Sequence, residues 1–233
     1  MNLTPGTLKN FAKKLTPYRD ILLFIAAFVG LNLLWKLLVD GGMDDGVLSV
    51  LGCDITSWVH PLCVRTAEIA HHVLHGILGY SDHIIDGTTI YFPHSPVKLN
   101  VVWDCTGIKQ IIIVSLLLMC CYGPLKKKLY YIPLAIVILY ITNVIRITTT
   151  ALIIKDGFPD WFISFNEWYN HKVWVSPEVS KMDFEIDWFQ FFHKEVFNWI
   201  YYEGVVFVLW LVWQEAINVP FQRKKKKKEE QKN

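Results

Sequence analysis

The sequence predicts an all-α multipass membrane protein with about four transmembrane helices, further extracytoplasmic or interfacial helices and a small β-hairpin. Of its 233 residues, 53% are hydrophobic and only 19% are charged, which differs from the composition of a soluble domain. Four segments are apolar enough to be interpreted as spans. Lys and Arg are nearly balanced by Asp and Glu, at 23 against 21, and the chain has 14 Phe, 10 Tyr and 10 Trp. This composition excludes a nucleic-acid-binding protein and a disordered chain.

The four predicted spans are defined by runs that can cross about 30 Å of hydrocarbon with every backbone polar group paired inside a helix. The second is short and carries Lys109 and Gln110. The spans are residues 21–39, 107–122, 129–154 and 196–217.

Basic residues predict the orientation of these spans, because cytoplasmic flanks are enriched in Lys and Arg. One cluster precedes the first span, Lys126 to Lys128 join the second to the third, and Arg223 to Lys228 follow the fourth. Four spans place all three clusters on one side. We therefore expect a single integral domain, residues 1–233, in the cell (inner) membrane. Residues 1–20 and the basic tail 218–233 are then cytoplasmic, and 40–106 and 155–195 are extracytoplasmic.

The first predicted extracytoplasmic segment contains two patterns of apolar residues. Residues 47–80 have a helical spacing of apolar residues, interrupted by Pro61, which predicts an external or interfacial helix. Residues 89–92 and 97–101 alternate as strands do and predict a β-hairpin, whose second strand leads into Cys105.

Three chemically capable residues meet at the outer membrane face under this topology. Cys105 lies at the start of the second span, where free N–H groups and the helix dipole favour a thiolate. Arg146 lies sixteen residues after Tyr130, about 24 Å along a helix axis, and an intramembrane charge indicates function. His193 stands just outside the fourth span and is the usual type of proton carrier for a thiol. Together they suit acyl transfer.

Two further residues lie on the same helix faces as Cys105 and Arg146. Lys109 lies four residues after Cys105, and Asn143 lies three before Arg146. Glu203 offers an alternative, because either Arg146 or Lys109 could pair with it at comparable depth. That arrangement would make the chain a non-enzymatic membrane assembly or transport subunit with a buried Arg/Lys/Glu network.

Histidines and cysteines elsewhere leave two other options open. His71 and His75 have a spacing that could hold a metal for a membrane hydrolase, but the motif contains no acidic residue, so we predict no metal and no cofactor. Cys53 and Cys63 could form a disulfide in an oxidising compartment. The sequence has no CxxC, P-loop, GxGxxG or GxSxG motif.

Three blocks of this sequence resemble the signature blocks of the exosortase and archaeosortase family, especially compact exosortases from Bacteroidota. They are VVWDCTGIKQ at 101–110, TNVIRI at 142–147 and FFHKEVFNWIYYEG at 191–204. The resemblance covers roughly residues 84–212 and implies a role for each matching residue. Cys105 matches the nucleophile, with Thr106 and Gly107 completing its Cys-Ser/Thr-Gly block. Arg146 and Asn143 match the Asn-x-x-Arg block, and His193 matches the third position; the resemblance gives Lys109 no role.

The resemblance further implies a membrane-embedded cysteine protease or transpeptidase. It would cleave C-terminal sorting signals from exported proteins, hold each cleaved protein as a thioester on Cys105 and transfer that protein to an acceptor. The expected partners are membrane-anchored substrate proteins and the lipid bilayer, and no nucleic acid. The acceptor, the recognition motif and the oligomeric state stay open.

Overall fold

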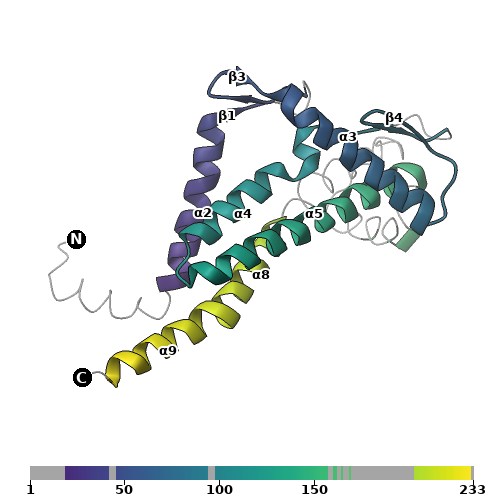
Figure 1. The fold of residues 1–233 in the computed structure, drawn as a ribbon. Coiled ribbons are helices and arrows are strands. Elements are labelled where there is room, and N and C mark those ends of the chain that lie inside the picture. Colours follow the sequence, from purple (N-terminus) through teal and green to yellow (C-terminus); the bar gives the residue numbers. More distant parts are fainter. Residues whose placement is uncertain are drawn as a thin grey trace.

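A computed structural model describes residues 19–41, 46–93, 98–156, 160–161, 164, 168 and 202–231. These residues are mostly helical, with two small antiparallel sheets. Figure 1 shows the sheets and α3 at one end of the molecule and α9, with the C-terminus, at the other. The prediction of a mainly helical membrane protein with a small β-hairpin is confirmed.

Three of the described helices are long and apolar enough to cross a membrane. They are α2 (Arg19–Leu38), α5 (Leu125–Asp156) and the continuous run Tyr202–Glu230, in which α8 (Val205–Val212), η5 (Trp213–Asn218) and α9 (Val219–Glu230) follow one another. The fourth apolar helix, α4 (Ile108–Cys120), has only 13 residues. At about 1.5 Å per residue it is roughly 20 Å long, shorter than the hydrocarbon core.

A three-stranded sheet follows α2, where the sequence predicts helix from residue 47. β1 (Val39–Asp40) pairs with β2 (Ser49–Val50), which pairs with β3 (Cys53–Asp54). The two residues between β2 and β3 are Leu51 and Gly52, with φ of 52° and 80°. Positive φ at both central positions is the geometry of a tight hairpin turn and is incompatible with a helix. The predicted helix therefore begins later.

That helix is α3 (Thr56–His72), which continues through the π-helical turn η2 (Val73–Ile77). The Asp54 carboxylate accepts a hydrogen bond from the Thr56 N–H at 2.8 Å, which satisfies a free donor at the start of α3. Pro61 lies inside the helix without ending it. One face, which includes Ala67, Ala70 and Leu74, is fully buried.

The predicted hairpin exists and has one strand more than the sequence indicates. β5 (Thr89–Tyr91) pairs with β6 (Lys98–Asn100), Ile90 lying opposite Leu99. β4 (Ile84–Asp86) adds to the other edge of β5 through a turn at Gly87, whose φ is 57°. Ile90 and Leu99 point into the core, which seats the sheet against α3 and α5.

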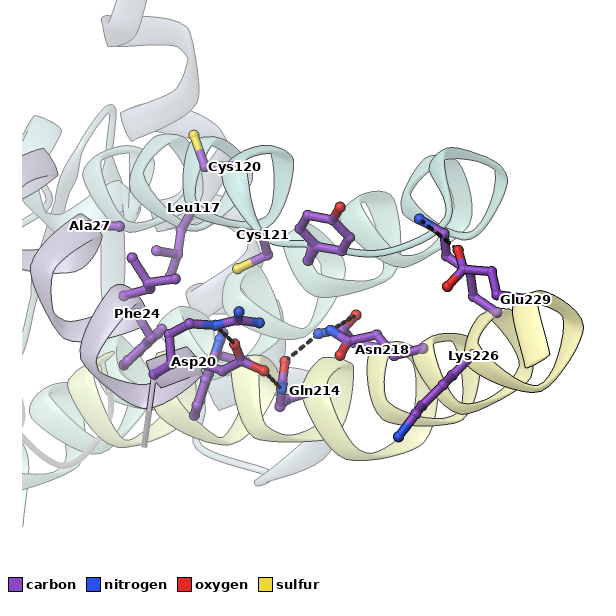
Figure 2. Close-up of a pocket in the computed structure, with 16 residues that line it drawn as sticks. Asp20, Phe24, Ala27, Leu117, Cys120, Cys121, Gln214, Asn218, Lys226 and Glu229 are labelled. Carbon is purple, nitrogen blue, oxygen red and sulfur yellow. Dashed lines mark hydrogen bonds and ion pairs between the residues drawn. The ribbon is translucent and has the colours of Figure 1, made fainter. Parts of the chain in front are cut away.

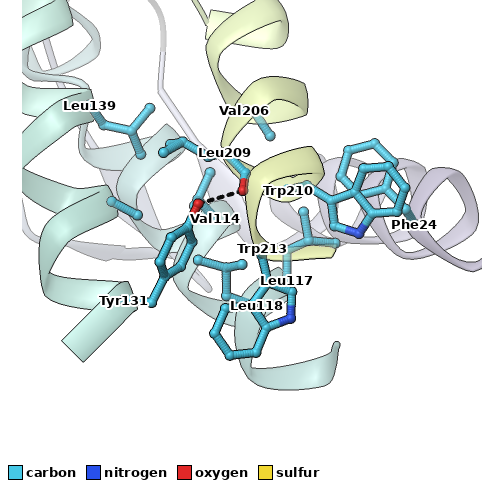
Figure 3. Packing of buried hydrophobic residues seen from close by; sticks show 11 residues of the cluster. Phe24, Val114, Leu117, Leu118, Tyr131, Leu139, Val206, Leu209, Trp210 and Trp213 are labelled. Carbon is cyan, nitrogen blue, oxygen red and sulfur yellow. Dashed lines mark hydrogen bonds between the residues drawn. The ribbon is translucent and has the colours of Figure 1, made fainter. Parts of the chain in front are cut away.

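The largest hydrophobic core joins α2, α4, α5 and α8, and Figure 3 shows its aromatic side chains packed between them. Phe24 stacks on Trp210 with ring centroids 4.3 Å apart, and the Tyr131 hydroxyl donates to the Leu209 carbonyl at 2.7 Å. A second core, under the sheet, contains Cys105 and Ile147.

The turn between α4 and α5 lies against the C-terminal helix. Lys128 is buried, and its Nζ donates to the carbonyls of Met119 and Cys121 at 2.6 and 2.5 Å, which caps the end of α4. The Trp213 Nε1–H donates to the Tyr122 carbonyl at 3.0 Å. Arg19 and two lysines of α9, Lys225 and Lys226, border one cavity beside this turn. We call this end of the molecule, defined by Arg19, Lys128 and residues 223–228, the basic end.

Candidate active site

Cys105 lies in η3 (Trp103–Thr106), a 3₁₀ turn between the second sheet and α4. Its N–H donates to the Val102 carbonyl at 2.9 Å. The Thr106 hydroxyl donates to the Trp103 carbonyl at 2.6 Å and accepts a longer bond from the Ile108 N–H at 3.4 Å. Thr106 therefore closes the turn that carries Cys105 and tethers it to the start of α4.

Gly107 has the left-handed conformation, with φ of 73°, and precedes the first residue of α4. A Cβ at this position would lie 3.4 Å from Asn143 Cγ, so a side chain would meet both backbone strain and a close neighbour. Glycine thus lets the Cys105 turn approach α5 closely.

Asn143 connects the turn to two helices and has no exposed surface. Its Nδ2 donates to the Cys105 carbonyl at 2.7 Å, and its Oδ1 accepts from the Tyr202 hydroxyl at 2.5 Å. Both ends of the amide are therefore satisfied, which holds the Cys105 backbone, α5 and the start of the C-terminal helix in one arrangement.

Arg146 lies one turn further along α5 and is 5% exposed. Its positive charge lies close enough to Cys105 to lower the pKa of that thiol, and its Cζ lies 4.9 Å from the centroid of the Tyr202 ring. The Arg146 Nε–H is buried and has no partner among the described residues. The site therefore contains a cation beside a thiol, with one donor not yet engaged.

Burial raises the pKa of the Cys105 thiol above its ordinary value, and the Arg146 charge opposes this only in part. Asp104 adds a further increase. Burial therefore favours the neutral thiol, against the expectation of a thiolate favoured by the helix dipole. Its position in a buried turn ahead of α4, rather than in the first turn of that helix, is the physical reason.

Of the seven predicted site residues, the structure brings together Cys105, Arg146, Asn143, Thr106 and Gly107. His193 lies outside the described residues. Lys109 does not join this group.

Lys109 instead lines a small pocket of about 20 Å³ with Asn32, Gln110 and Glu203. This volume holds about one water molecule. Of the two pairings that the sequence left open for Glu203, the structure thus favours Lys109, while Arg146 faces Tyr202.

Tyr202 is the site residue that sequence reasoning missed. It is 2% exposed and contacts both Asn143 and Arg146. The sequence indicates its burial but not its role, since Tyr202, Val206, Leu209 and Trp213 follow the spacing of one helix face, and all four are buried.

The histidines of the HHxxH motif lie on α3 and η2. The His71 ring lies 6.0 Å from that of His75 and 4.7 Å from that of His83, which is buried. Burial lowers the pKa of His71 and of His83, which favours neutral imidazoles. Within the described residues, no group of three or more His, Cys, Asp or Glu is arranged to hold a metal ion.

Cys53 and Cys63 are both free thiols. Cys53 is exposed on β3, whereas Cys63 is buried on α3 against Trp103. The possible disulfide between them is not formed.

Comparison with known protein families identifies the family to which this site belongs. Residues 46–169 match the family model described as Transmembrane exosortase (Exosortase_EpsH), and these 124 residues are more than half of the 233. The chain belongs to the transmembrane exosortase family. The matched range includes Cys105, Asn143 and Arg146 and ends before His193 and Tyr202. No curated protein and no solved structure matches the chain. Membership assigns it broadly to protein sorting at a membrane, in agreement with its three membrane-spanning candidates.

Proposed function

We propose that this exosortase-family chain is a cysteine transpeptidase that cleaves C-terminal sorting signals of exported, membrane-anchored proteins. Cys105 is the nucleophile, Arg146 stabilises the oxyanion and His193 carries the proton. The observation that carries this proposal is the burial of Arg146 and Cys105 in one site, one helical turn from the Asn143 amide that holds the Cys105 carbonyl, with the Arg146 Nε–H unpartnered among the described residues.

The neutral thiol requires a base before it can attack. In the proposed reaction His193 takes the Cys105 proton as Sγ bonds to a substrate backbone carbonyl carbon. The tetrahedral oxyanion accepts hydrogen bonds from Arg146, and donors of this kind typically contribute about 2.7 to 4 kcal/mol. The C–N bond then breaks, and the leaving amine takes the proton from His193. An acceptor nucleophile, deprotonated by His193, releases the product from the thioester.

A site at the outer membrane face suits a substrate that is held by its own C-terminal anchor. Such a substrate diffuses in two dimensions, and its cleavage point has a fixed height above the bilayer. We place the termini in the cytoplasm and Cys105 toward the extracytoplasmic side of the cell membrane, on the charge pattern of the three basic clusters. Arg146 lies 18 residues beyond Lys128 on α5, about 27 Å along its axis, which supports this placement.

The test is to trap the thioester in cells that express the full chain. Membranes are denatured at low pH, where thioesters last, and peptides containing Cys105 are analysed by mass spectrometry for a covalently attached protein C-terminus. We expect an adduct on Cys105, and hydroxylamine should release it. The released protein identifies the substrate.

Cys63 provides the matched control, because it is also a buried cysteine in the same half of the molecule. Cys105→Ala should abolish the adduct and leave the precursor uncleaved, whereas Cys63→Ala should preserve both. Normal processing in the Cys105→Ala chain would eliminate the proposed nucleophile.

A further inference from the structure

A second, larger cavity lies at the basic end, away from Cys105. It encloses about 700 Å³ between α2, the end of α4 and the C-terminal helix (Figure 2). Pockets that enclose small organic ligands typically have about 300 to 1,000 Å³. No residue of the proposed active site lines it.

The lining of this cavity changes from apolar to ionic along its length. Phe24, Leu117 and Trp210 form an apolar wall that belongs to the main core. Lys226 and Glu229 lie at the opposite part (Figure 2), and Lys225 of the same helix also lines the cavity. Arg19 is bonded to Asp20, beside Phe24. This order matches an amphiphile with one hydrocarbon part and one anionic head, whereas a free inorganic anion would leave the apolar wall uncovered.

The charges of the cavity favour an anion. Three cations and two carboxylates, Asp20 and Glu229, leave a net charge of +1 on the lining. Asp20 is already engaged, since it accepts from Gln214 Nε2 at 2.7 Å and from Arg19 Nε at 3.3 Å. Lys225 is only loosely paired, 3.9 Å from Glu229, and both side chains are exposed. The lysines are therefore available to a stronger acceptor.

A polar ladder forms one wall between the two parts. Gln222 donates to Asn218, Asn218 to Gln214, and Gln214 to Asp20, so successive turns of the helix present amides to the cavity. Ester and phosphate oxygens at the head of a lipid are suitable partners for such groups.

We propose that this cavity binds one anionic phospholipid of the leaflet at the basic end. Its phosphate lies at Lys225 and Lys226, and an acyl chain covers the Phe24–Trp210 wall. The proposal is independent of the chemistry at Cys105. It would tie the start of α2 to α9 through a ligand that the bilayer supplies.

Two native cysteines report on this site. Cys120 and Cys121 both line the cavity, whereas Cys53 is exposed on β3 at the other end of the molecule. The full chain, stripped of lipid in neutral detergent, is treated with N-ethylmaleimide, and modification of each cysteine is followed by peptide mass spectrometry. The additions are phosphatidylglycerol, phosphatidylcholine or inorganic phosphate.

We expect phosphatidylglycerol to slow modification of Cys120 and Cys121, by roughly tenfold at ten times its Kd, because few sites then remain empty. Cys53 should react at an unchanged rate. Equal protection by phosphatidylcholine would mean that the cavity binds any lipid regardless of headgroup charge. Protection by inorganic phosphate would mean that it binds free anions. Either result overturns the proposal. So does an absence of protection by any addition.

Two charge-reversal variants in α9 complete the test. Lys225→Glu with Lys226→Glu should lose the protection by phosphatidylglycerol. Lys227→Glu with Lys228→Glu changes the same charge on the same helix, but these residues do not line the cavity, so protection should persist. Each variant is compared with and without lipid, which cancels any change in intrinsic thiol reactivity. Equal behaviour of the two variants would refute the assignment.

Discussion

A single phenolic hydroxyl, that of Tyr202, connects the C-terminal helix to the backbone of the proposed nucleophile through Asn143. Tyr202→Phe removes this hydroxyl and retains the ring beneath Arg146. Loss of one partner of a buried hydrogen bond costs about 1 to 3 kcal/mol, so we expect a lower unfolding temperature. We also expect slower alkylation of Cys105 and slower precursor processing, because Asn143 no longer has its amide fixed.

Tyr131→Phe is the matched control for this prediction. The Tyr131 hydroxyl also joins α5 to the C-terminal helix, through the Leu209 carbonyl, but at a site twelve residues before Asn143. Both variants should lose similar stability, and only Tyr202→Phe should slow the alkylation of Cys105. If both variants slow the alkylation of Cys105 equally, Tyr202 acts through general stability and has no positioning role.

Arg146 should control the ionisation of Cys105. Its charge lowers the thiol pKa that burial raises, so Arg146→Gln should raise that pKa further. The alkylation rate of Cys105, measured against pH, should then reach its midpoint at a higher pH than in the unsubstituted chain. Arg146→Lys keeps the positive charge, so its pH midpoint should stay close to that of the unsubstituted chain. Its precursor processing should be lost nearly as fully as in Arg146→Ala, since Lys lacks the planar fork of donors. An unchanged midpoint in the Gln variant would contradict the contact.

The sequence allowed some of these residues to be predicted and not others. Cys105, Asn143 and Arg146 stand out because polar side chains in apolar helices are costly and therefore informative. Tyr202 does not, since an aromatic residue in an apolar helix is ordinary and Tyr201 precedes it. The ionisation state of Cys105 was also beyond the sequence, because it depends on how deeply the turn is buried.

At the scale of elements, the turn between α4 and α5 depends on one glycine. Gly123 has φ of 143°, and a Cβ there would lie 2.6 Å from the ring of Trp213, which is fully buried. Gly123→Ala should therefore destabilise the protein by about 1 to 3 kcal/mol, measured as thermal unfolding in detergent. Gly30→Ala, inside α2 with no atom within 4 Å, should be neutral or stabilising. Equal losses in both would show that the turn is not tightly packed.

Predicted elements succeeded where periodicity was long and failed where a turn decided the structure. The pairing of β5 with β6 follows from alternation around Pro93 and Pro96, and the prediction was right. The first sheet was missed because its strands have two residues each, too few to show alternation. The positive φ of Leu51, which breaks the expected helix, has no sequence signal in a leucine.

At the scale of the whole molecule, helix lengths place Cys105 short of the C-terminal end of α5. α4 measures only about 20 Å, and α5 continues ten residues, about 15 Å, beyond Arg146. The proposed nucleophile is thus recessed among helices and sheet rather than displayed on an external domain. This favours a substrate segment that leaves the bilayer beside the enzyme.

The same architecture predicts which cysteines a reagent reaches from outside the cell. Cys53 is exposed on β3, and Glu230, exposed near the end of α9, lies at the basic end. In intact cells that express a Glu230→Cys chain, a membrane-impermeant maleimide should modify Cys53 and should reach position 230 only after the membrane is opened. Peptide mass spectrometry measures both sites in one sample, so each serves as the control for the other. Modification of position 230 in intact cells, with Cys53 unmodified, would show that the topology is the reverse of the proposed one. Cys105 would then lie on the cytoplasmic side, where an exported substrate could not meet it.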